Sequence, residues 1–237
     1  MCGFCETDNV GSKLVHDVPI VQNRNVAERT RFTLAHTVRQ GTRADFRLEA
    51  GSIDAILVKN LGNTPFHADD VPKHTVAMIS ALIKDIQRVV DVPISVDILR
   101  NDAEAALSIA AATTASFIRA GVHVGTLVTD QGIVTRRAAE TLRLRDHLRT
   151  DVEILADVSV KHSAPAAERP LTETITDIIS REHADGIIAS GVGTGHKIDC
   201  GHLNTVVDVR DSLETGIPVF VDSGVTLETI ADIYSNV

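Results

Sequence analysis

The segment from residue 117 to residue 132 has the residue types and spacing of a strand that ends in reactive groups. It reads FIRAGVHVGTLVTDQG, with Arg119 and His123 in a short apolar run and Asp130 and Gln131 in the polar stretch after it. Alternate side chains of a strand share a face, so Arg119 and His123 are predicted to point the same way. A buried strand that opens into a polar loop is typical of a parallel β/α barrel, whose active groups gather at the carboxyl ends of its strands.

Other apolar runs carry charges in equivalent places. Asp97 lies in PISVDIL, Asp157 lies in EILADVSV, and Lys161 follows that run directly. Facing the lumen of a barrel, His123 and Asp157 would form a general acid and base, with Lys161 holding an anionic group and Asp97 nearby. A salt-bridge network that only satisfies charges inside the barrel is the alternative. Both interpretations stay open at this stage.

The loops after the strands supply a second group of polar or glycine residues, which we expect at the mouth of the barrel as ligand contacts. Gly-rich turns would offer backbone N–H groups to a phosphate, although such turns also arise from geometry alone. Asp130 and Gln131 are expected in a loop that covers the mouth, and Asp102 is expected to cap a helix. The predicted ligand contacts are Asn60, Arg100, Asn101, Arg119, Asp130, Gln131, Ser190, Gly191, Thr194, Gly195, Ser223 and Gly224.

The order of apolar runs predicts the architecture. Residues 1–25 are expected to be a loosely held segment with one strand-like fragment at 18–21, and residues 26–237 to form one barrel domain, opening with a ragged helical pattern over 26–50. From residue 53 onward strands and helices alternate, which is typical of βαβ units and a parallel sheet. Charges inside the strands favour a closed barrel over an open sheet covered on both faces. We expect strands at 53–58, 93–99, from 117, at 153–160, 186–190 and 218–222, and helices at 75–90, 103–113, 136–148, 172–182, 203–214 and from 227.

Composition narrows the class of protein. Hydrophobic residues make up 43% of the 237 residues and aromatic residues only 3%, so an aliphatic core suited to buried parallel strands is expected. The net charge of -9 argues against general binding to nucleic acid. No apolar run is long enough to span a bilayer, so a cytoplasmic protein is expected, at most peripheral to a membrane. The bias toward Arg over Lys and Asp over Glu would suit a salt-rich cytosol, or reflect a GC-rich genome.

Cysteine content assigns no metal and no redox centre. Cys2 and Cys5 have the spacing of a metal knuckle, but no second pair follows them and Cys200 lies far away. Metal ligands are therefore predicted to be absent, and no cofactor is assigned.

Six runs taken together resemble one family. IDAILVKNLGNTPF, PISVDILRNDAEAALSIA, FIRAGVHVGTLVTDQGIV, AAETLRLRDHL, ILADVSVKH and ADGIIASGVGTG, in that order, are similar to the BtpA/SgcQ family over about residues 44 to 230. The resemblance implies a TIM-type (β/α)8 barrel related to the phosphate-binding barrels. It implies no single activity, because the family is named for a cyanobacterial protein of photosystem I biogenesis while other members stand beside sugar-metabolism genes.

The chain departs from the family pattern at several positions. Lys59 and Asp97 stand where the family has Glu and Asn, Asn63 replaces an Asp, and Gly121 replaces an Asn. The family's first strand has no recognisable counterpart before residue 26, and the chain ends before an expected eighth strand. We therefore expect a barrel that is incomplete at both ends and imperfectly closed. Its free edges would favour a homo-oligomer.

Three functions remain open. The first is an enzyme or binding protein for a small anionic metabolite, phosphorylated or sugar-like, held at the carboxyl-end mouth. The second is a biogenesis or stability factor for a membrane protein complex, which would act through an exposed surface. The third is an incomplete, inactive copy.

Overall fold

The fold was analysed in a computed structural model of the chain. The structure describes residues 18–20, 32–36 and 54–235, except residues 62, 64, 89, 192, 194, 195, 223, 227 and 228.

Within the described residues the main sheet has eight strands, and seven of them run parallel. Ladders join each neighbouring pair in the order β1-β2-β3-β4-β5-β8-β10-β11, and only β1 runs antiparallel to its neighbour. The strands are β1 (Val18–Ile20), β2 (Phe32–His36), β3 (Ala55–Lys59), β4 (Ile94–Asp97), β5 (Phe117–Ala120), β8 (Glu153–Asp157), β10 (Gly186–Ser190) and β11 (Val219–Asp222).

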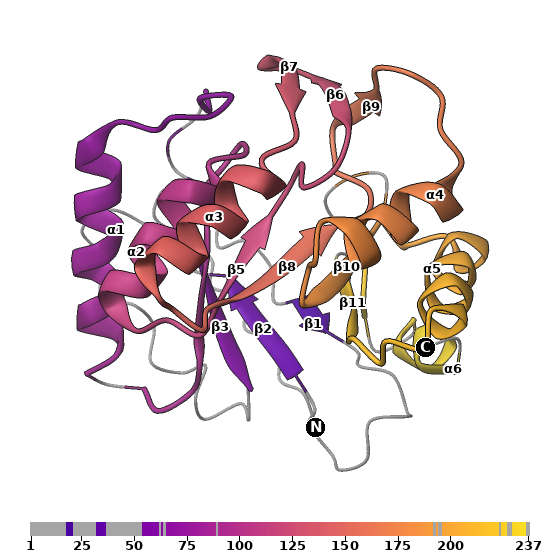
Figure 1. The fold of residues 1–237 in the computed structure, drawn as a ribbon. Helices are drawn as coiled ribbons and strands as arrows, with labels where there is room; N and C mark the ends of the chain where they lie inside the picture. Colours follow the sequence, from indigo (N-terminus) through magenta and orange to yellow (C-terminus); the bar gives the residue numbers. More distant parts are fainter. Residues whose placement is uncertain are drawn as a thin grey trace.

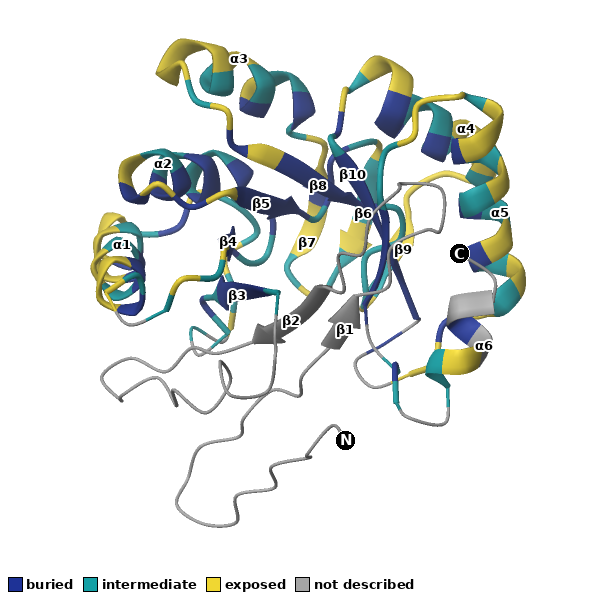
Figure 2. Cartoon of the chain, turned by 90° about the horizontal axis from the view of Figure 1, so that it is seen from below, coloured by how far each residue is buried: buried dark blue, intermediate teal, exposed yellow. Residues whose placement is uncertain are grey.

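Helices cover the outside of this sheet, as Figure 1 and Figure 2 show. Each parallel strand from β3 onward is followed by helix before the next strand of the sheet, which is the βα alternation predicted from the sequence. The helices are α1 (Lys73–Ile86), α2 (Ala103–Thr113), α3 (Ala138–Leu148), α4 (Leu171–Thr176) with the π-helical turn η2 (Asp177–Arg181), α5 (Cys200–Ser212) and α6 (Ile230–Ser235). Asp102 caps α2, since its side chain accepts a hydrogen bond from Ala105 N at 2.9 Å.

Strands β3, β4, β5, β8, β10 and β11 are buried on both faces, which explains their continuous apolar runs. Outward-facing residues pack against the helices in two clusters, one under α1 and α2 and one under α4, α5 and α6. Inward-facing residues form a third, lumenal cluster of Ala55, Leu57, Phe117, Leu155, Ile188 and Phe220. Side chains therefore fill the lumen of the barrel.

The barrel is not closed by a continuous ladder. β1 and β11 stand at the two ends of the hydrogen-bonded order and lie close to each other, yet within the described residues no ladder joins them. β2 takes the place beside β3, and the short antiparallel β1 stands where a regular barrel has another parallel strand. The expected TIM-type barrel with irregular ends is therefore confirmed.

One part of the N-terminal region differs from expectation. The helical pattern predicted over residues 26–50 is wrong at Phe32–His36, which forms β2 in parallel register with β3. The run FTLAH fits a strand because Phe and Thr favour the pleated backbone, and pairing with strands on both sides supplies its hydrogen bonds. Val18–Ile20, within the strand-like fragment predicted at 18–21, forms β1.

A small second sheet lies over the carboxyl ends of the barrel strands, at the top of Figure 1. It has the order β7-β6-β9, with β6 (Thr126–Thr129), β7 (Gly132–Thr135) and β9 (Ser163–Pro165). The sequence predicts a loop at Asp130 and Gln131 and no strand at residues 163–165. The β6–β7 hairpin carries Asp130 and Gln131 at its turn, and Gly132 has a φ of 100°, a conformation that glycine adopts readily.

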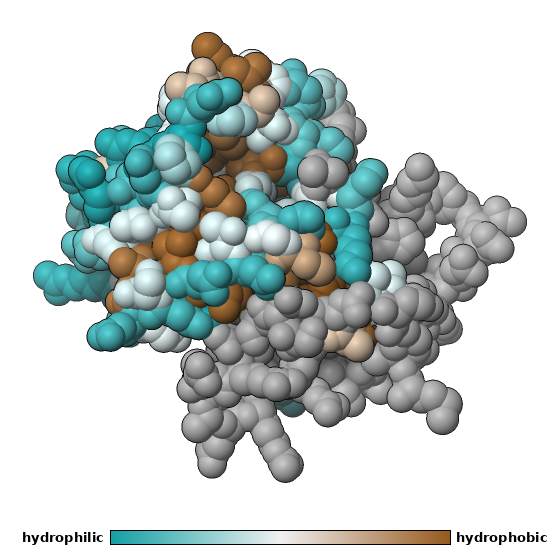
Figure 3. Space-filling view, turned by 90° about the vertical axis from the view of Figure 1, so that its right-hand side faces the viewer, coloured by the Kyte–Doolittle hydropathy of each residue, from teal (hydrophilic) through white to brown (hydrophobic). Residues whose placement is uncertain are grey.

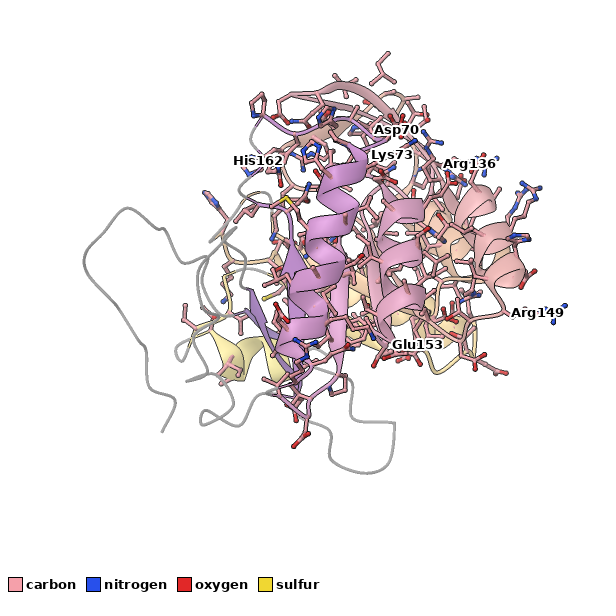
Figure 4. All side chains as sticks on the ribbon, turned by 90° about the vertical axis from the view of Figure 1, so that its left-hand side faces the viewer. Asp70, Lys73, Arg136, Arg149, Glu153 and His162 are labelled. Atoms are coloured by element: carbon pink, nitrogen blue, oxygen red, sulfur yellow. The ribbon has the colours of Figure 1, made fainter. Side chains whose placement is uncertain are left out.

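The two ends of the barrel are easily told apart in Figure 4. Asp70 and Lys73, at the start of α1, lie with His162 toward the mouth, whereas Glu153 at the start of β8 lies at the base.

The irregular junction between β1 and β11 predicts self-association. Strand edges that lack a partner pair readily with a second chain. Sedimentation velocity at micromolar concentration should therefore give a species larger than the 25.4 kDa monomer. A single monomeric species under those conditions would contradict the prediction.

Candidate functional site

A layer of charge lies above the apolar layer of the lumen. On β3, β5, β8 and β11 a charged residue stands two positions after a lumenal apolar one, so alternation turns both into the lumen. Lys59 follows Leu57, Asp157 follows Leu155, and Asp222 follows Phe220. We call the resulting group of Lys59, Asp97, Arg119, Asp157, Lys161 and Asp222 the lumenal charge cluster.

Arg119 is the centre of the cluster. Its Nε and Nη2 donate to the two carboxylate oxygens of Asp157 at 2.9 and 2.7 Å, and its Nη1 donates to Asp222 Oδ2 at 2.7 Å. Asp97 Oδ2 lies 4.0 Å from Nε. Burial alone would lower the pKa of Arg119, but the three carboxylates together raise it well above the ordinary value, so the guanidinium stays charged.

Two lysines complete the cluster at its rim. Lys59 Nζ lies 2.8 Å from Asp97 Oδ2, and Lys161 Nζ lies 2.6 Å from Asp222 Oδ2. The lysine side chains keep 14% and 15% of their surface exposed, against 6% and 4% for these two carboxylates. A molecule that enters from the mouth therefore meets the ammonium groups before the carboxylates.

Burial shifts two groups of the cluster toward their neutral forms. It raises the pKa of Asp157, although the Arg119 guanidinium offsets part of that effect. Burial also lowers the pKa of Lys161; Asp222 opposes this shift and Arg119 adds to it. A carboxyl with a raised pKa and an amine with a lowered pKa thus belong to one network, an arrangement common at sites of proton transfer.

His123 does not join the cluster. β5 ends at Ala120, the backbone bends after it, and His123 Nε2 lies 2.8 Å from the carbonyl oxygen of Glu182 at the end of η2. The charges that act on its pKa belong to Glu182, Arg145 and Asp185, in and around the helical layer. The structure therefore does not assemble the predicted acid and base pair of His123 with Asp157, because the alternation of side chains stops where the strand stops.

Two residues predicted to contact a ligand, Asn60 and Asn101, form hydrogen bonds with the protein's own backbone. Asn60 donates to the carbonyl of Leu99 at 3.1 Å and accepts from its N–H at 2.7 Å. Asn101 accepts from Val122 N at 2.7 Å and donates to the carbonyls of Val122 and Thr135. Each asparagine is buried and ties the loop after one strand to the loop after the next.

Arg100 ties the hairpin to the mouth. Its Nε donates to Gln131 Oε1 at 2.9 Å, its Nη2 donates to Asp130 Oδ1 at 3.2 Å, and its Nη1 donates to the carbonyl of Lys161 at 3.4 Å. The guanidinium also lies 5.9 Å from the centre of the Phe66 ring. The structure thus places Asp130 and Gln131 on a hairpin turn, where both contact Arg100.

The glycines predicted to cradle a phosphate are packed against the protein's own backbone. A Cβ at Gly191 would collide with the carbonyl of His196, and a Cβ at Gly224 would collide with the backbone of Lys197. Close packing of the segment at His196 therefore accounts for both glycines. The predicted contacts Thr194, Gly195 and Ser223 lie outside the described residues.

Ser190 is placed differently from these glycines. Ile187 and Ala189 of β10 face the helices while Ile188 faces the lumen, so alternation turns Ser190 into the lumen beside its ladder partner Asp222. The hydroxyl is buried and has no hydrogen-bond partner among the described residues.

Lys59 and Asp222 are members of the cluster that the sequence did not single out as site residues, and signals for both are present. Asp222 ends the apolar run PVFVD, as Asp157 ends another. Lys59 and Asp97 were noted as separate departures from the family pattern, and the structure shows that they contact each other.

The described residues contain no group of three or more His, Cys, Asp or Glu side chains arranged to hold a metal ion. Among the helices of the described residues, none is both long and apolar enough to cross a membrane.

The buried His123 predicts a pH effect on stability. Burial lowers the pKa of His123, so below the ordinary value of about 6.5 the unfolded chain takes up a proton that the folded chain does not. The free energy of unfolding should therefore decrease as pH falls below about 6.5, with a contribution of up to about 1.4 kcal/mol per pH unit from one proton. His123→Gln keeps a donor for the Glu182 carbonyl and should show a shallower decrease between about pH 6.5 and 5 in urea unfolding.

Comparing the parent with His123→Gln also controls for the other groups whose pKa shifts on folding. His202, whose pKa is also lowered by burial, and the raised pKa of Asp157 affect parent and variant alike, so the difference isolates His123. Equal slopes for the two proteins would show that His123 does not titrate differently on folding.

Comparison with known proteins places the chain in a family. It is 35% identical over 228 residues to "Photosystem I biogenesis protein BtpA" of Synechocystis, which covers 96% of this chain and 77% of that protein. It is 37% identical over 182 residues to an uncharacterised protein of Pyrococcus horikoshii, covering 77% of this chain and 67% of that protein. Among solved structures, a FabK variant of Thermotoga maritima matches with a TM-score of 0.47 and 15% identity, covering 79% of this chain and 50% of that one. A family model described as "BtpA family" matches residues 15–237, and the chain belongs to the BtpA family.

Proposed function

We propose that this protein binds, and acts on, a small phosphorylated or sugar-like metabolite at the carboxyl-end mouth of its barrel. The observation that carries the proposal is the lumenal charge cluster, whose members come from β3, β4, β5, β8 and β11 and from the segment after β8. Barrels of this type perform their chemistry at this end.

The exposure of the charges favours an anionic ligand. Lys59 and Lys161 are the most exposed members of the cluster, and their carboxylate partners lie beneath them. An anionic group at the mouth would interact with both ammonium groups without contacting a carboxylate first.

Ser190 adds a neutral contact to the same site. Its buried hydroxyl lies on the lumenal face beside Asp222 and can both donate and accept a hydrogen bond. A hydroxyl or carbonyl oxygen of a sugar-like ligand is a suitable partner. The proposed site therefore offers cations for an anionic group and a hydroxyl for a polar one.

Lys161→Ala tests whether the cluster binds a ligand or only stabilises the fold. Because Arg119 still donates to Asp222 in this variant, folding should weaken by only about 1 kcal/mol, while affinity for a phosphorylated sugar should fall by roughly tenfold or more. Urea unfolding gives the first quantity, and calorimetric titration with a panel of sugar phosphates gives the second.

Two further variants calibrate this test. Arg119→Met removes the buried partner of Asp157 and should destabilise the fold by about 3–5 kcal/mol. Arg145→Ala removes an ion pair with Asp185 in the helical layer and should leave ligand affinity unchanged. If Lys161→Ala destabilises as much as Arg119→Met and the parent binds no sugar phosphate, the cluster is structural and the proposal is wrong.

A second candidate function rests on the hairpin at the mouth. Val128 and Ile133 are direct cross-strand partners on one face of β6–β7, with 48% and 70% of their surfaces exposed. Figure 3 shows apolar side chains at the top of the molecule, where this hairpin lies. A biogenesis or stability factor, the role in the name of the Synechocystis relative, would use such a surface to contact a membrane protein complex.

A double variant tests this second function. Val128→Ser with Ile133→Ser should reduce by several-fold the amount of protein that co-sediments with membranes of its host, since the contact would lose its apolar area. The thermal midpoint should not change, because both side chains are exposed. Unchanged co-sedimentation, or none with the parent protein, would eliminate the hairpin as a contact surface.

A further inference from the structure

We infer that Lys161 is a nucleophilic lysine that forms an imine with the carbonyl group of its ligand. The inference rests on the proposed function, because it assigns a reactive role to one residue of the proposed site. It names the substrate class as an aldehyde or ketone that carries an anionic group.

Two cations share one carboxylate oxygen in this site. Asp222 Oδ2 accepts from Arg119 Nη1 at 2.7 Å and from Lys161 Nζ at 2.6 Å. Positive charges held this close repel each other, and a guanidinium does not lose its proton in proteins. Lys161 is therefore the group that can relieve the repulsion by becoming a neutral amine, which is the form that attacks carbonyl carbon.

The acceptor for the proton is already in contact. Transfer from Lys161 Nζ to Asp222 Oδ2 along the 2.6 Å contact turns an ammonium and a carboxylate into an amine and a carboxylic acid. The summed charge of the pair is zero before and after the transfer. The direction of the Lys161 pKa, lowered by burial and by Arg119, agrees with this arrangement.

The bond changes balance without a further reagent. The lone pair of Nζ attacks the carbonyl carbon, and the carbonyl oxygen takes the proton held by Asp222. The Asp222 carboxylate then accepts a proton from the nitrogen, which gives a neutral carbinolamine. Asp222 returns this proton to the hydroxyl, which leaves as water, and a protonated imine remains. This cation stands where the ammonium stood, so it still faces the Asp222 carboxylate.

The backbone holds Lys161 in place for this role. Its carbonyl accepts from Arg100 Nη1 at 3.4 Å, and two residues later Ser163 pairs with Thr129 in the sheet over the mouth. A nucleophile needs a fixed approach to its target as well as a free electron pair. With 15% of its side chain exposed, Lys161 is also reachable from the mouth.

Lys59 is placed to bind the anionic group of the ligand. It pairs with Asp97 at 2.8 Å, and Arg119 lies farther from that carboxylate, at 4.0 Å. Among the described residues, Asp97 Oδ2 therefore has one cation in close contact, whereas Asp222 Oδ2 has two. Its positive charge also acts on Lys161, so both lysines face the same mouth. Lys59 is then suited to bind the anionic group while Lys161 bonds to the carbonyl carbon.

Reductive trapping tests the inference. The full chain is incubated with glycolaldehyde phosphate, glyceraldehyde 3-phosphate or dihydroxyacetone phosphate, with sodium borohydride added to reduce any imine to a stable amine. Mass spectrometry of the digested protein should locate the adduct on Lys161, at roughly tenfold or more the level on Lys73, an exposed lysine at the start of α1. The yield at Lys161 should rise with pH as the neutral amine becomes more populated.

Lys161→Arg separates this inference from the proposed function. The variant keeps a cation beside Asp222 but has no amine, so it should bind the same sugar phosphates with an affinity within about tenfold of the parent and give no adduct at position 161. Binding by the parent without an adduct on Lys161 overturns the imine and leaves the proposed function standing. Equal labelling of Lys161 and Lys73 also overturns it. Failure of the parent both to bind and to be labelled overturns both proposals.

Discussion

The bond of Arg119 to two carboxylates is the interaction on which the top of the lumen depends. A guanidinium inside a barrel is stable only if anions accept its hydrogen bonds, and Asp157 and Asp222 do so from strands on the same side of the ring. Arg119 thereby links β5 with β8, its neighbour in the sheet, and with β11, which is not its neighbour. The same contact fixes the place of Asp222 and, through it, that of the Lys161 ammonium. A structural interaction therefore sets the geometry of the groups that we propose to be reactive.

The alternation of side chains along the strands predicts most of the lumenal charge cluster. It gives no correct direction for side chains beyond the strand ends. Asp97, Asp157 and Arg119 lie within strands, so the period of two gives their faces correctly. His123 lies three residues beyond the end of β5, where bends replace the pleat, and its side chain meets η2 instead. Which charged residues pair with each other could not be predicted either, because Arg119 and Asp222 are 103 residues apart in the chain. Periodicity gives the face of a residue, but only the closure of the barrel brings distant strands together.

The loops at the mouth were hardest to predict because their partners are other loops. β6 is stabilised by pairing with β9, a segment more than thirty residues later that reads as a Pro-containing loop. Asn60, Asn101 and Arg100 each have the residue type of a ligand contact, yet each forms hydrogen bonds with the loop that follows the next strand. Polar residue type alone does not distinguish a side chain that binds a ligand from one that holds a loop in position. These ties have a functional consequence as well, because a mouth whose loops are joined needs less ordering when a ligand binds.

The pair of Lys59 and Asp97 indicates how the cluster divides between structure and function. Each residue would be costly alone, since a cation or an anion would stand in the lumen without its partner. Together they form a neutral pair that leaves the contacts of Arg119 with Asp157 and Asp222 intact. The rim of the cluster can therefore change in charge pattern while its centre stays the same. Under the proposed function a ligand meets the rim first, so exchange of this one pair would alter which ligand the mouth favours without altering the interaction that holds the lumen together.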